Sequence, residues 1–169
     1  MPVSNAKAGE AVVIRGADIL LETLGPGDVD EILALESLCF EYHWNADQFR
    51  RGLLAGAFHV LGLRLGEHLV GYGAYSVVVD EMEVLNLAVH PKLRRRGLGD
   101  RLLRAMLLDC ASRGVRTGFL DVKVSNTAAI DLYRKFGFNQ IGIRRKYYPD
   151  TGEDALLFRL DFPAAGEIG

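Results

Sequence analysis

The sequence predicts a mixed α/β fold, in which about four helices cover a central, mostly antiparallel sheet of about six or seven strands. Short apolar runs typical of strands alternate with segments whose apolar residues recur at helical spacing. Clusters of glycine, proline, asparagine and aspartate separate these segments. The length of 169 residues fits one compact domain, and no internal repeat or low-complexity segment interrupts the pattern.

Composition and charge are ordinary for a globular protein. Apolar residues make up 49% of the chain, charged residues 25%, and the formal net charge is −2. A general nucleic-acid-binding protein would be more basic, so no nucleic-acid partner is expected. Cys39 and Cys110 lack metal-type spacing, and no apolar run has the length of a signal peptide or a membrane span. The sequence therefore predicts a cytoplasmic protein without a metal centre or a membrane partner, in which Cys110 is a buried free thiol.

One domain with two short tails is expected. The polar start of the chain predicts a loose tail over residues 1–18, although residues 11–18 could also be extended. A single domain is expected over residues 19–162, and a second tail over residues 163–169.

The domain begins with a strand and two helices. An apolar run at residues 19–24 predicts the strand, and Asp28 is placed to cap a helix over residues 29–40, whose apolar residues recur at helical spacing. Either Asn45 or Asp47 can cap a short second helix.

Three strands follow in sequence. Residues 57–66 and 67–80 predict a pair of strands around a turn, and the almost continuous apolar run at residues 81–90 predicts a strand buried on both faces. Strict alternation along this third strand would place five side chains on one face: Glu81, Glu83, Leu85, Leu87 and Val89.

The remainder of the chain, from residue 98, predicts two helices and three strands. A helix over residues 98–113 ends at Gly114, and residues 117–124 predict the next strand. Ser125 or Asn126 then caps a helix that ends at Gly137. Two final strands, 138–148 and 154–162, flank the turn sequence PDTGE.

The sequence RRRGLG, residues 94–99, lies between a buried strand and a helix. Backbone N–H groups at a helix N-terminus lack partners within the helix and can bind phosphate oxygens, while glycine allows close approach and arginine adds charge. A Walker loop would need Gly-Lys-Ser/Thr, and a dinucleotide fingerprint would lie near the chain start. The sequence alone leaves an anion site and a solvated basic turn both open.

Three successive motifs carry a more specific resemblance. The R-x-x-G-x-G pattern resembles the acetyl-CoA loop of the GNAT acetyltransferases. Together, DEMEVLNLAVHPKLRRRGLG, LDVKVSNTAAIDLYRKFGF and RRKYYPDTGEDALLF resemble the motifs of the RimI-type ribosomal-protein-alanine N-acetyltransferases, in order and over residues 19–162. The resemblance implies a GNAT fold and an acetyl-CoA-dependent N-acetyltransferase.

The resemblance also implies where acetyl-CoA binds. The loop would hold the pyrophosphate, the strand before it would pair with the pantetheine arm, and Asn126 would contact the cofactor, unless it only caps its helix. The expected cofactor-binding residues are Leu87, Ala88, Val89, Arg94, Arg95, Arg96, Gly97, Leu98, Gly99, Asp100 and Asn126. Asp100 is expected to contribute its backbone rather than its side chain.

Acetyl transfer to an amine needs a base, an oxyanion donor and an acid for the departing thiolate. By resemblance, Tyr133 is the acid, although its place on an apolar helix face also suits core packing. Asp121 is the first candidate base; it stands where the RimI-type pattern has the longer glutamate, so it acts through water or only orients the amine. Glu83 is the second candidate, and the N–H of Val89 is the expected oxyanion donor.

The acceptor implied by the resemblance is a protein N-terminus, namely the N-terminal alanine of a small-subunit ribosomal protein. Tyr147 and Tyr148 match the tyrosine pair that lines the peptide slot in peptide-acetylating members, and an aromatic pair that only closes a hairpin is the alternative. Three aromatic residues are candidates for the opposite wall: Phe40, Tyr42 and Trp44.

Two other functions stay open at this point. The chain could acetylate a small-molecule amine, or it could bind coenzyme A without catalysis, since the carboxylate at residue 121 is one methylene shorter than in the pattern. The oligomeric state is expected to be a monomer or a weak homodimer.

Overall fold

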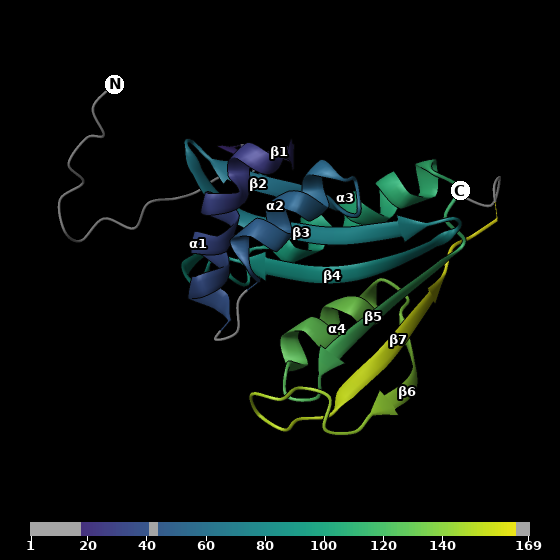
Figure 1. The fold of residues 1–169 in the computed structure, drawn as a ribbon. Helices are drawn as coiled ribbons and strands as arrows, with labels where there is room; N and C mark the ends of the chain where they lie inside the picture. The colour runs from purple at the N-terminus through teal and green to yellow at the C-terminus, as the bar shows by residue number, and fades with distance from the viewer. Residues whose placement is uncertain (1–17, 41–43, 165–169) are drawn as a thin grey trace.

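The computed structural model describes residues 18–40 and 44–164 and contains a mixed α/β fold (Figure 1). One sheet has the strand order β1-β2-β3-β4-β5-β7-β6, and every neighbouring pair is antiparallel except β4 and β5. The strands are β1 Ile19–Leu24, β2 His59–Leu65, β3 His68–Val78, β4 Glu81–Val89, β5 Thr117–Lys123, β6 Asn139–Arg144 and β7 Ala155–Asp161. The predicted fold class is confirmed.

The described residues contain four α-helices and two short 3₁₀-helices. The α-helices are α1 Val29–Cys39, α2 Ala46–Leu54, α3 Leu98–Ser112 and α4 Thr127–Lys135; the 3₁₀-helices are η2 Pro26–Asp28 and η3 Pro91–Leu93. Asn45, rather than Asp47, caps α2 and accepts from the N–H groups of Asp47 and Gln48. Asp28 makes no such cap for α1; its carboxylate binds the Gly25 N–H and Arg64 instead. None of these helices is long and apolar enough to cross a membrane.

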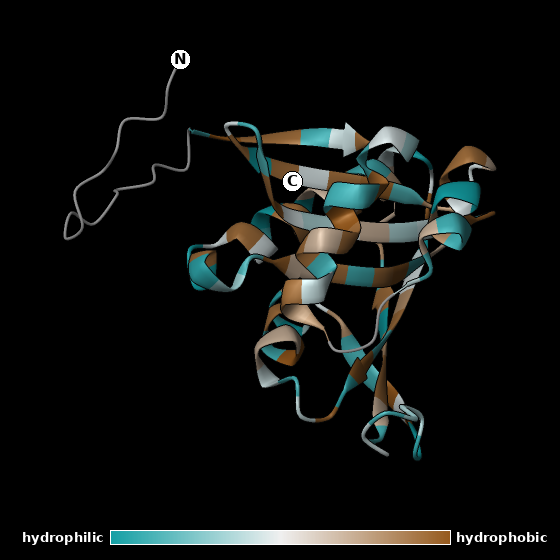
Figure 2. Ribbon diagram, turned by 60° about the vertical axis from the view of Figure 1, so that its left-hand side comes forward, coloured by the Kyte–Doolittle hydropathy of each residue, from teal (hydrophilic) through white to brown (hydrophobic). Residues whose placement is uncertain are grey.

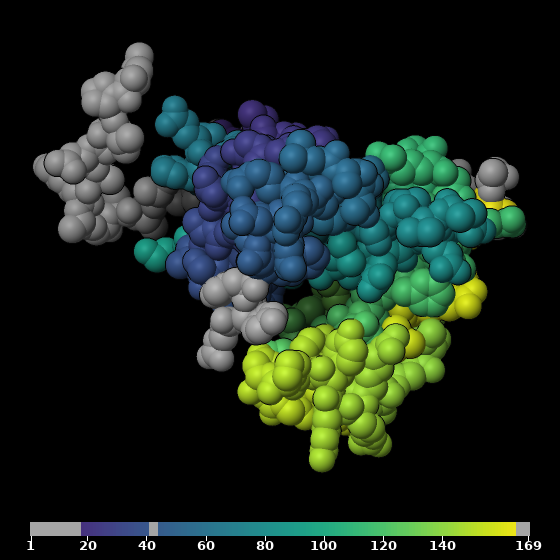
Figure 3. All heavy atoms as spheres, in the orientation of Figure 1, coloured from purple at the N-terminus to yellow at the C-terminus, as the bar shows by residue number. Residues whose placement is uncertain are grey.

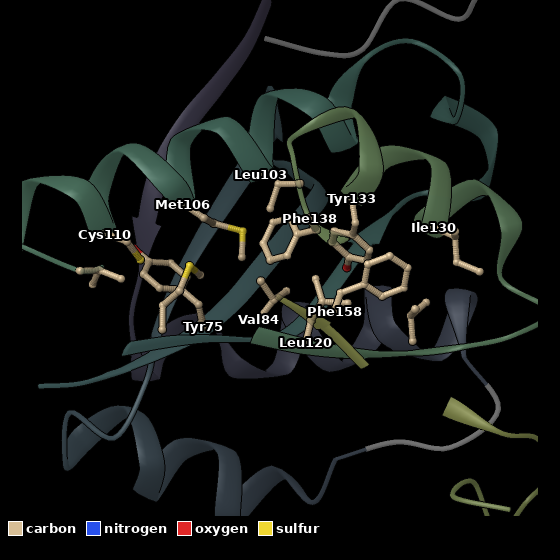
Figure 4. Packing of buried hydrophobic residues seen from close by; sticks show 13 residues of the cluster. Tyr75, Val84, Leu103, Met106, Cys110, Leu120, Ile130, Tyr133, Phe138 and Phe158 are labelled. Atoms are coloured by element: carbon tan, nitrogen blue, oxygen red, sulfur yellow. The ribbon is translucent and has the colours of Figure 1, made fainter. Parts of the chain in front are cut away.

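Helices cover the sheet on both faces. The apolar sides of α1 and α2 pack on one face in a cluster that includes Ile32, Phe49 and Tyr72. The other face packs against α3 and α4, with Met106 and the predicted buried thiol Cys110 among the enclosed side chains (Figure 4). Apolar stretches run along the strands, while the helices show both apolar and polar residues, as amphipathic elements should (Figure 2).

The sheet opens between its two parallel strands. β4 and β5 pair only from Glu81 to Glu83, opposite Thr117 to Phe119, although both strands continue beyond these residues. Past this point β5, β7, β6 and α4 diverge from the rest (Figure 1), and the surface is hollowed between the two halves (Figure 3). Two of the predicted catalytic residues, Glu83 and Asp121, line a groove next to this opening.

A bulge interrupts β4 and corrects one prediction. Tyr75 of β3 lies opposite Val84, but the next residue, Ala74, lies opposite Asn86, so Leu85 is an extra residue in β4. The bulge reverses the alternation beyond it. Leu87 and Val89 therefore pack on the α3 side and do not share a face with Glu83.

Candidate active site

The glycine loop ends in an exposed helix N-terminus. Gly97 adopts a left-handed conformation with φ 77°, and α3 begins at the next residue without a side-chain cap. The first intrahelical bond runs from the Arg101 N–H to the Gly97 carbonyl, so the N–H groups of Leu98, Gly99 and Asp100 have no acceptor within the helix. A Cβ on Gly97 would meet nothing within 4 Å, so the space in front of this turn is open. Such a turn suits a phosphate group.

The charged side chains of the loop make different contacts. Arg94, Arg95 and Arg96 are exposed, and Arg94 Nε donates to the Val89 carbonyl at 3.4 Å. The carboxylate of Asp100 binds Lys135 of α4, whose hydrogen bond lowers the pKa of Asp100. Asp100 therefore has its side chain engaged by α4, and its backbone N–H remains at the helix terminus.

Both candidate bases line one groove at the opening of the sheet. This groove has a volume of about 360 Å³ and is lined by Ser76, Val78, Glu81, Met82, Glu83, Phe119, Leu120, Asp121, Arg144 and Leu157. Asp121 lies on β5 with its side chain 17% exposed, and Arg144 Nε donates to it at 3.1 Å. Much of Glu83 is exposed to solvent, but the partial burial of its carboxyl group raises its pKa, and the negative charge of Asp121 is the next cause. A carboxylate with a raised pKa is better suited to accept and release a proton near neutral pH.

Tyr133 combines a buried ring with an unpaired hydroxyl. Tyr133 is 6% exposed, and its ring meets the Phe138 ring edge to face at 5.7 Å in the core under α3 and α4 (Figure 4). Burial raises its pKa, so the hydroxyl stays protonated at neutral pH. No described residue hydrogen-bonds to this hydroxyl, and because no fully buried side-chain oxygen among the described residues lacks a partner, the hydroxyl is accessible to solvent and its proton is available.

The tyrosine pair lies in the turn between β6 and β7. Tyr147 and Tyr148 meet edge to face at 5.2 Å, and Tyr147 is 48% exposed. Burial, with the nearby charge of Asp121 as the next cause, raises the pKa of Tyr148 to about 12, and Lys123 lies over its ring. Tyr148 thus stands close to the groove that holds the candidate bases.

The opposite aromatic wall is only partly described. Trp44 is partly buried, and its ring packs against Phe49 and Phe58 at 5.3 and 5.7 Å. Phe40 is partly buried against the same cluster, and Tyr42 lies outside the described residues.

Two features of this region were not predicted from the sequence. Arg144, the last residue of β6 and the first of the third motif, reaches Asp121, a contact that the motif did not indicate. Glu36 of α1 is buried and binds Asn86 of β4. Its place four residues after Ile32, on the apolar face of α1, was the available signal.

A sheet that opens between two parallel strands, beside a helix N-terminus whose first N–H groups have no acceptor within the helix, is typical of acyl-CoA-dependent transferases. The chain belongs to the acetyltransferase (GNAT) family, whose model matches residues 29–138. It is therefore an N-acetyltransferase, as the motifs predicted.

Individual relatives agree with this assignment. The chain is 38% identical over 149 residues to the N-alpha-acetyltransferase RimI of Mycobacterium tuberculosis, which covers 85% of this chain and 92% of that protein. It is 34% identical over 142 residues to the ribosomal protein bS18-alanine N-acetyltransferase of Salmonella typhimurium, and the match covers 83% of this chain and 95% of that protein. The crystal structure of the ribosomal-protein-S18-alanine N-acetyltransferase from Escherichia coli superimposes with a TM-score of 0.79 at 32% identity. The superposition covers 89% of this chain and 98% of that one. Arabidopsis thaliana NAA60 in complex with acetyl-CoA has the same fold, with a TM-score of 0.77 at 18% identity over 85% of this chain and 99% of that one.

Proposed function

We propose that this chain transfers the acetyl group of acetyl-CoA to the N-terminal α-amino group of a protein, and that this acceptor is the N-terminal alanine of ribosomal protein bS18. The observation that carries the proposal is the identity of 32–38% over nearly the full length of proteins named for this type of reaction. The paired tyrosines beside an open groove support a peptide acceptor.

Residues at the opening of the sheet are proposed to hold the cofactor. When bound, acetyl-CoA supplies an acetyl thioester that is activated for attack by an amine. The N–H groups between Arg95 and Asp100 bind its pyrophosphate, with the exposed arginines Arg94 to Arg96 adding charge. Leu87, Ala88 and Val89 offer backbone groups to the pantetheine arm. Asn126 caps α4 through Oδ1, which leaves its Nδ2 free to donate to the cofactor.

The two groove carboxylates are the proposed bases. Asp121, directly or through one water, takes the proton from the acceptor ammonium, while Arg144 fixes its orientation. Glu83 is the alternative, and the raised pKa of its carboxyl is the argument for it.

The remaining roles belong to Val89 and the tyrosines. The N–H of Val89 stabilises the developing oxyanion, and the protonated hydroxyl of Tyr133 donates to the departing sulfur. Tyr147 and Tyr148 form one side of the acceptor slot, and the segment containing Tyr42 and Trp44 forms the other.

We further infer one acetyltransferase domain over residues 19–162, between tails at 1–18 and 163–169. The proposed setting is the cytoplasm, where ribosomal proteins are made, and the chain acts as a monomer or weak homodimer without a nucleic-acid partner.

Thiol release from acetyl-CoA tests the acceptor. We expect release with a short peptide that begins with alanine, and none above background with the same peptide blocked at its N-terminus or with spermidine. Release driven by spermidine would make a small-molecule amine the substrate. Coenzyme A binding without turnover of any acceptor would favour the non-catalytic alternative.

A further inference from the structure

A carboxylate is buried between α1 and the bulge of β4. Glu36 is 1% exposed, and it is the only charged residue in the buried class among those the structure describes. Burying a charged group is unfavourable unless hydrogen-bond donors surround it. A residue of this kind needs an explanation that apolar packing does not supply.

Two donors from the sheet converge on one oxygen of Glu36. Asn86 Nδ2 donates to Oε1 at 2.9 Å and the Tyr72 hydroxyl donates to the same atom at 3.2 Å. Asn86 Nδ2 also lies 2.7 Å from the Tyr72 oxygen. Burial and the charge of Glu36 raise the pKa of Tyr72, so this hydroxyl remains a donor.

The network reaches both halves of the proposed site. Asn86 is a residue of the β4 bulge, and its Oδ1 accepts the N–H of Leu87 at 3.0 Å, on the strand proposed to bind the cofactor. The second oxygen of Glu36, Oε2, accepts the N–H of Trp44 at 3.4 Å. Trp44 directly precedes Asn45, the cap of α2, on the side proposed for the acceptor.

We propose that Glu36 is a positioning residue for acetyl transfer: one buried carboxylate fixes the β4 bulge through Asn86 and fixes the start of the acceptor wall through Trp44. This inference rests on the proposed function of the site. Bringing an amine and a thioester together depends on geometry, and small misplacements reduce the rate strongly. If fold stability alone were at stake, apolar residues of similar volume would serve as well as a buried polar network.

Amide hydrogen exchange of the full chain, without any acceptor, tests the link directly. Glu36→Gln removes the charge and one acceptor oxygen but keeps the shape of the side chain. We expect the N–H groups of Leu87 and Trp44 to exchange about tenfold faster in this variant, because hydrogen bonds to charged groups are the stronger ones. Asp30→Asn, the same charge change at an exposed position of α1, is the control and should leave both rates unchanged. Unchanged exchange at Leu87 and Trp44 in folded Glu36→Gln would overturn the proposal.

Kinetics below the melting temperature separate positioning from fold stability. In Glu36→Gln we expect kcat with the alanine peptide to fall about tenfold. Asn86→Asp should be worse, because two carboxylates then face each other. The double variant Glu36→Gln/Asn86→Asp exchanges the amide and the carboxylate and should recover to within about threefold of the wild-type rate. If all three variants lose melting temperature but keep the wild-type kcat and KM, Glu36 is only structural.

The two proposals can fail separately. If the wild-type chain acetylates a different amine, the proposed acceptor is wrong, and the kinetic comparison is made with that amine. The exchange experiment does not involve an acceptor, so it decides the role of Glu36 in either case.

Discussion

Carboxylates lie on both sides of the β4 bulge, and their surroundings differ. Glu83 and Asp121 line an open groove beside a single arginine, Arg144. Glu36 lies on the other side under α1 and accepts hydrogen bonds from a hydroxyl, an amide and a backbone N–H. A carboxylate held by several donors has a fixed orientation, whereas one beside a second carboxylate binds a proton more readily. We therefore expect proton transfer from the groove pair and fixed geometry from Glu36.

The largest effect should come from removing a groove carboxylate. We expect Asp121→Asn to lower kcat by about a hundredfold or more, because general base catalysis typically contributes this much. Glu83→Gln should cost less if Asp121 is the base. Both variants should bind coenzyme A as the wild type does, measured by calorimetry, and both should keep their melting temperature to within a few degrees.

Glu81→Gln is the matched control for this pair. Glu81 lines the same groove at the start of β4 but has no proposed role, so its kcat should change by less than about twofold. A large loss in Glu83→Gln together with a small loss in Asp121→Asn would exchange the two assignments.

Two buried tyrosines, one with a proposed role in catalysis and one without, allow the next test. Tyr133→Phe should lower kcat by about a hundredfold at unchanged affinity for coenzyme A, because its unpaired hydroxyl is the proposed acid. Tyr75 is the control: it also packs under α3, but its hydroxyl donates to Asp109 at 2.6 Å, and it has no proposed role in catalysis. Tyr75→Phe should therefore lose melting temperature and keep its kcat. The opposite pattern, a full rate in Tyr133→Phe, would leave Tyr133 as a core residue only.

Gly97 tests the cofactor end of the site with a smaller effect. Alanine at φ 77° costs roughly 1–2 kcal/mol of backbone strain, and a Cβ there meets no other atom. We expect Gly97→Ala to weaken binding of coenzyme A by about fivefold or more, measured by calorimetry. Gly56→Ala carries the same penalty at φ 67°, also in open space, but it follows α2, away from the loop. It should lose a similar amount of stability without any change in affinity for coenzyme A, and an equal loss of affinity in both variants would argue against the loop as the binding site.

Local sequence signals predicted most elements because their causes are local. The strand at residues 19–24 and the cap at Asn45 depend on a short apolar run and on one side chain next to a helix start. The β4 bulge depends on pairing with β3, so its effect on Leu87 and Val89 could not be deduced from alternation. Asp28 matched a cap pattern, but Arg64 is distant in sequence and competes for its carboxylate.

The candidate catalytic residues came from motifs rather than from local structural patterns. The motifs named Asp121, Glu83 and Tyr133, and the structure brings Asp121 and Glu83 to one groove. Arg144 and Glu36 were missed because each acts through a contact with a strand that is distant in the sequence, β5 for Arg144 and β4 for Glu36.

The smallest predicted effect concerns stability and pH at Glu83. Its folded-state pKa is raised by burial and by Asp121, so the folded chain binds a proton there more tightly than the unfolded chain does. The resulting stability is present below the unfolded pKa of about 4.3 and is lost as pH rises through the higher folded value. Glutamine does not ionise, so Glu83→Gln does not lose this stability as the pH rises. Relative to wild type, its melting temperature should therefore rise by up to a few degrees between about pH 4 and pH 7.

Asp100 provides the comparison of opposite sign. Its hydrogen bond to Lys135 lowers the folded-state pKa, so its contribution to stability is present above the unfolded pKa and is lost as pH falls through the folded value. Asp100→Asn should therefore be less stable than wild type at about pH 7 and approach it in acid. If the stabilities of Glu83→Gln and Asp100→Asn relative to wild type changed in the same direction with pH, the groove would not disfavour charge on Glu83. The argument from its pKa for Glu83 as a base would then be lost, and Asp121 would remain as the single candidate.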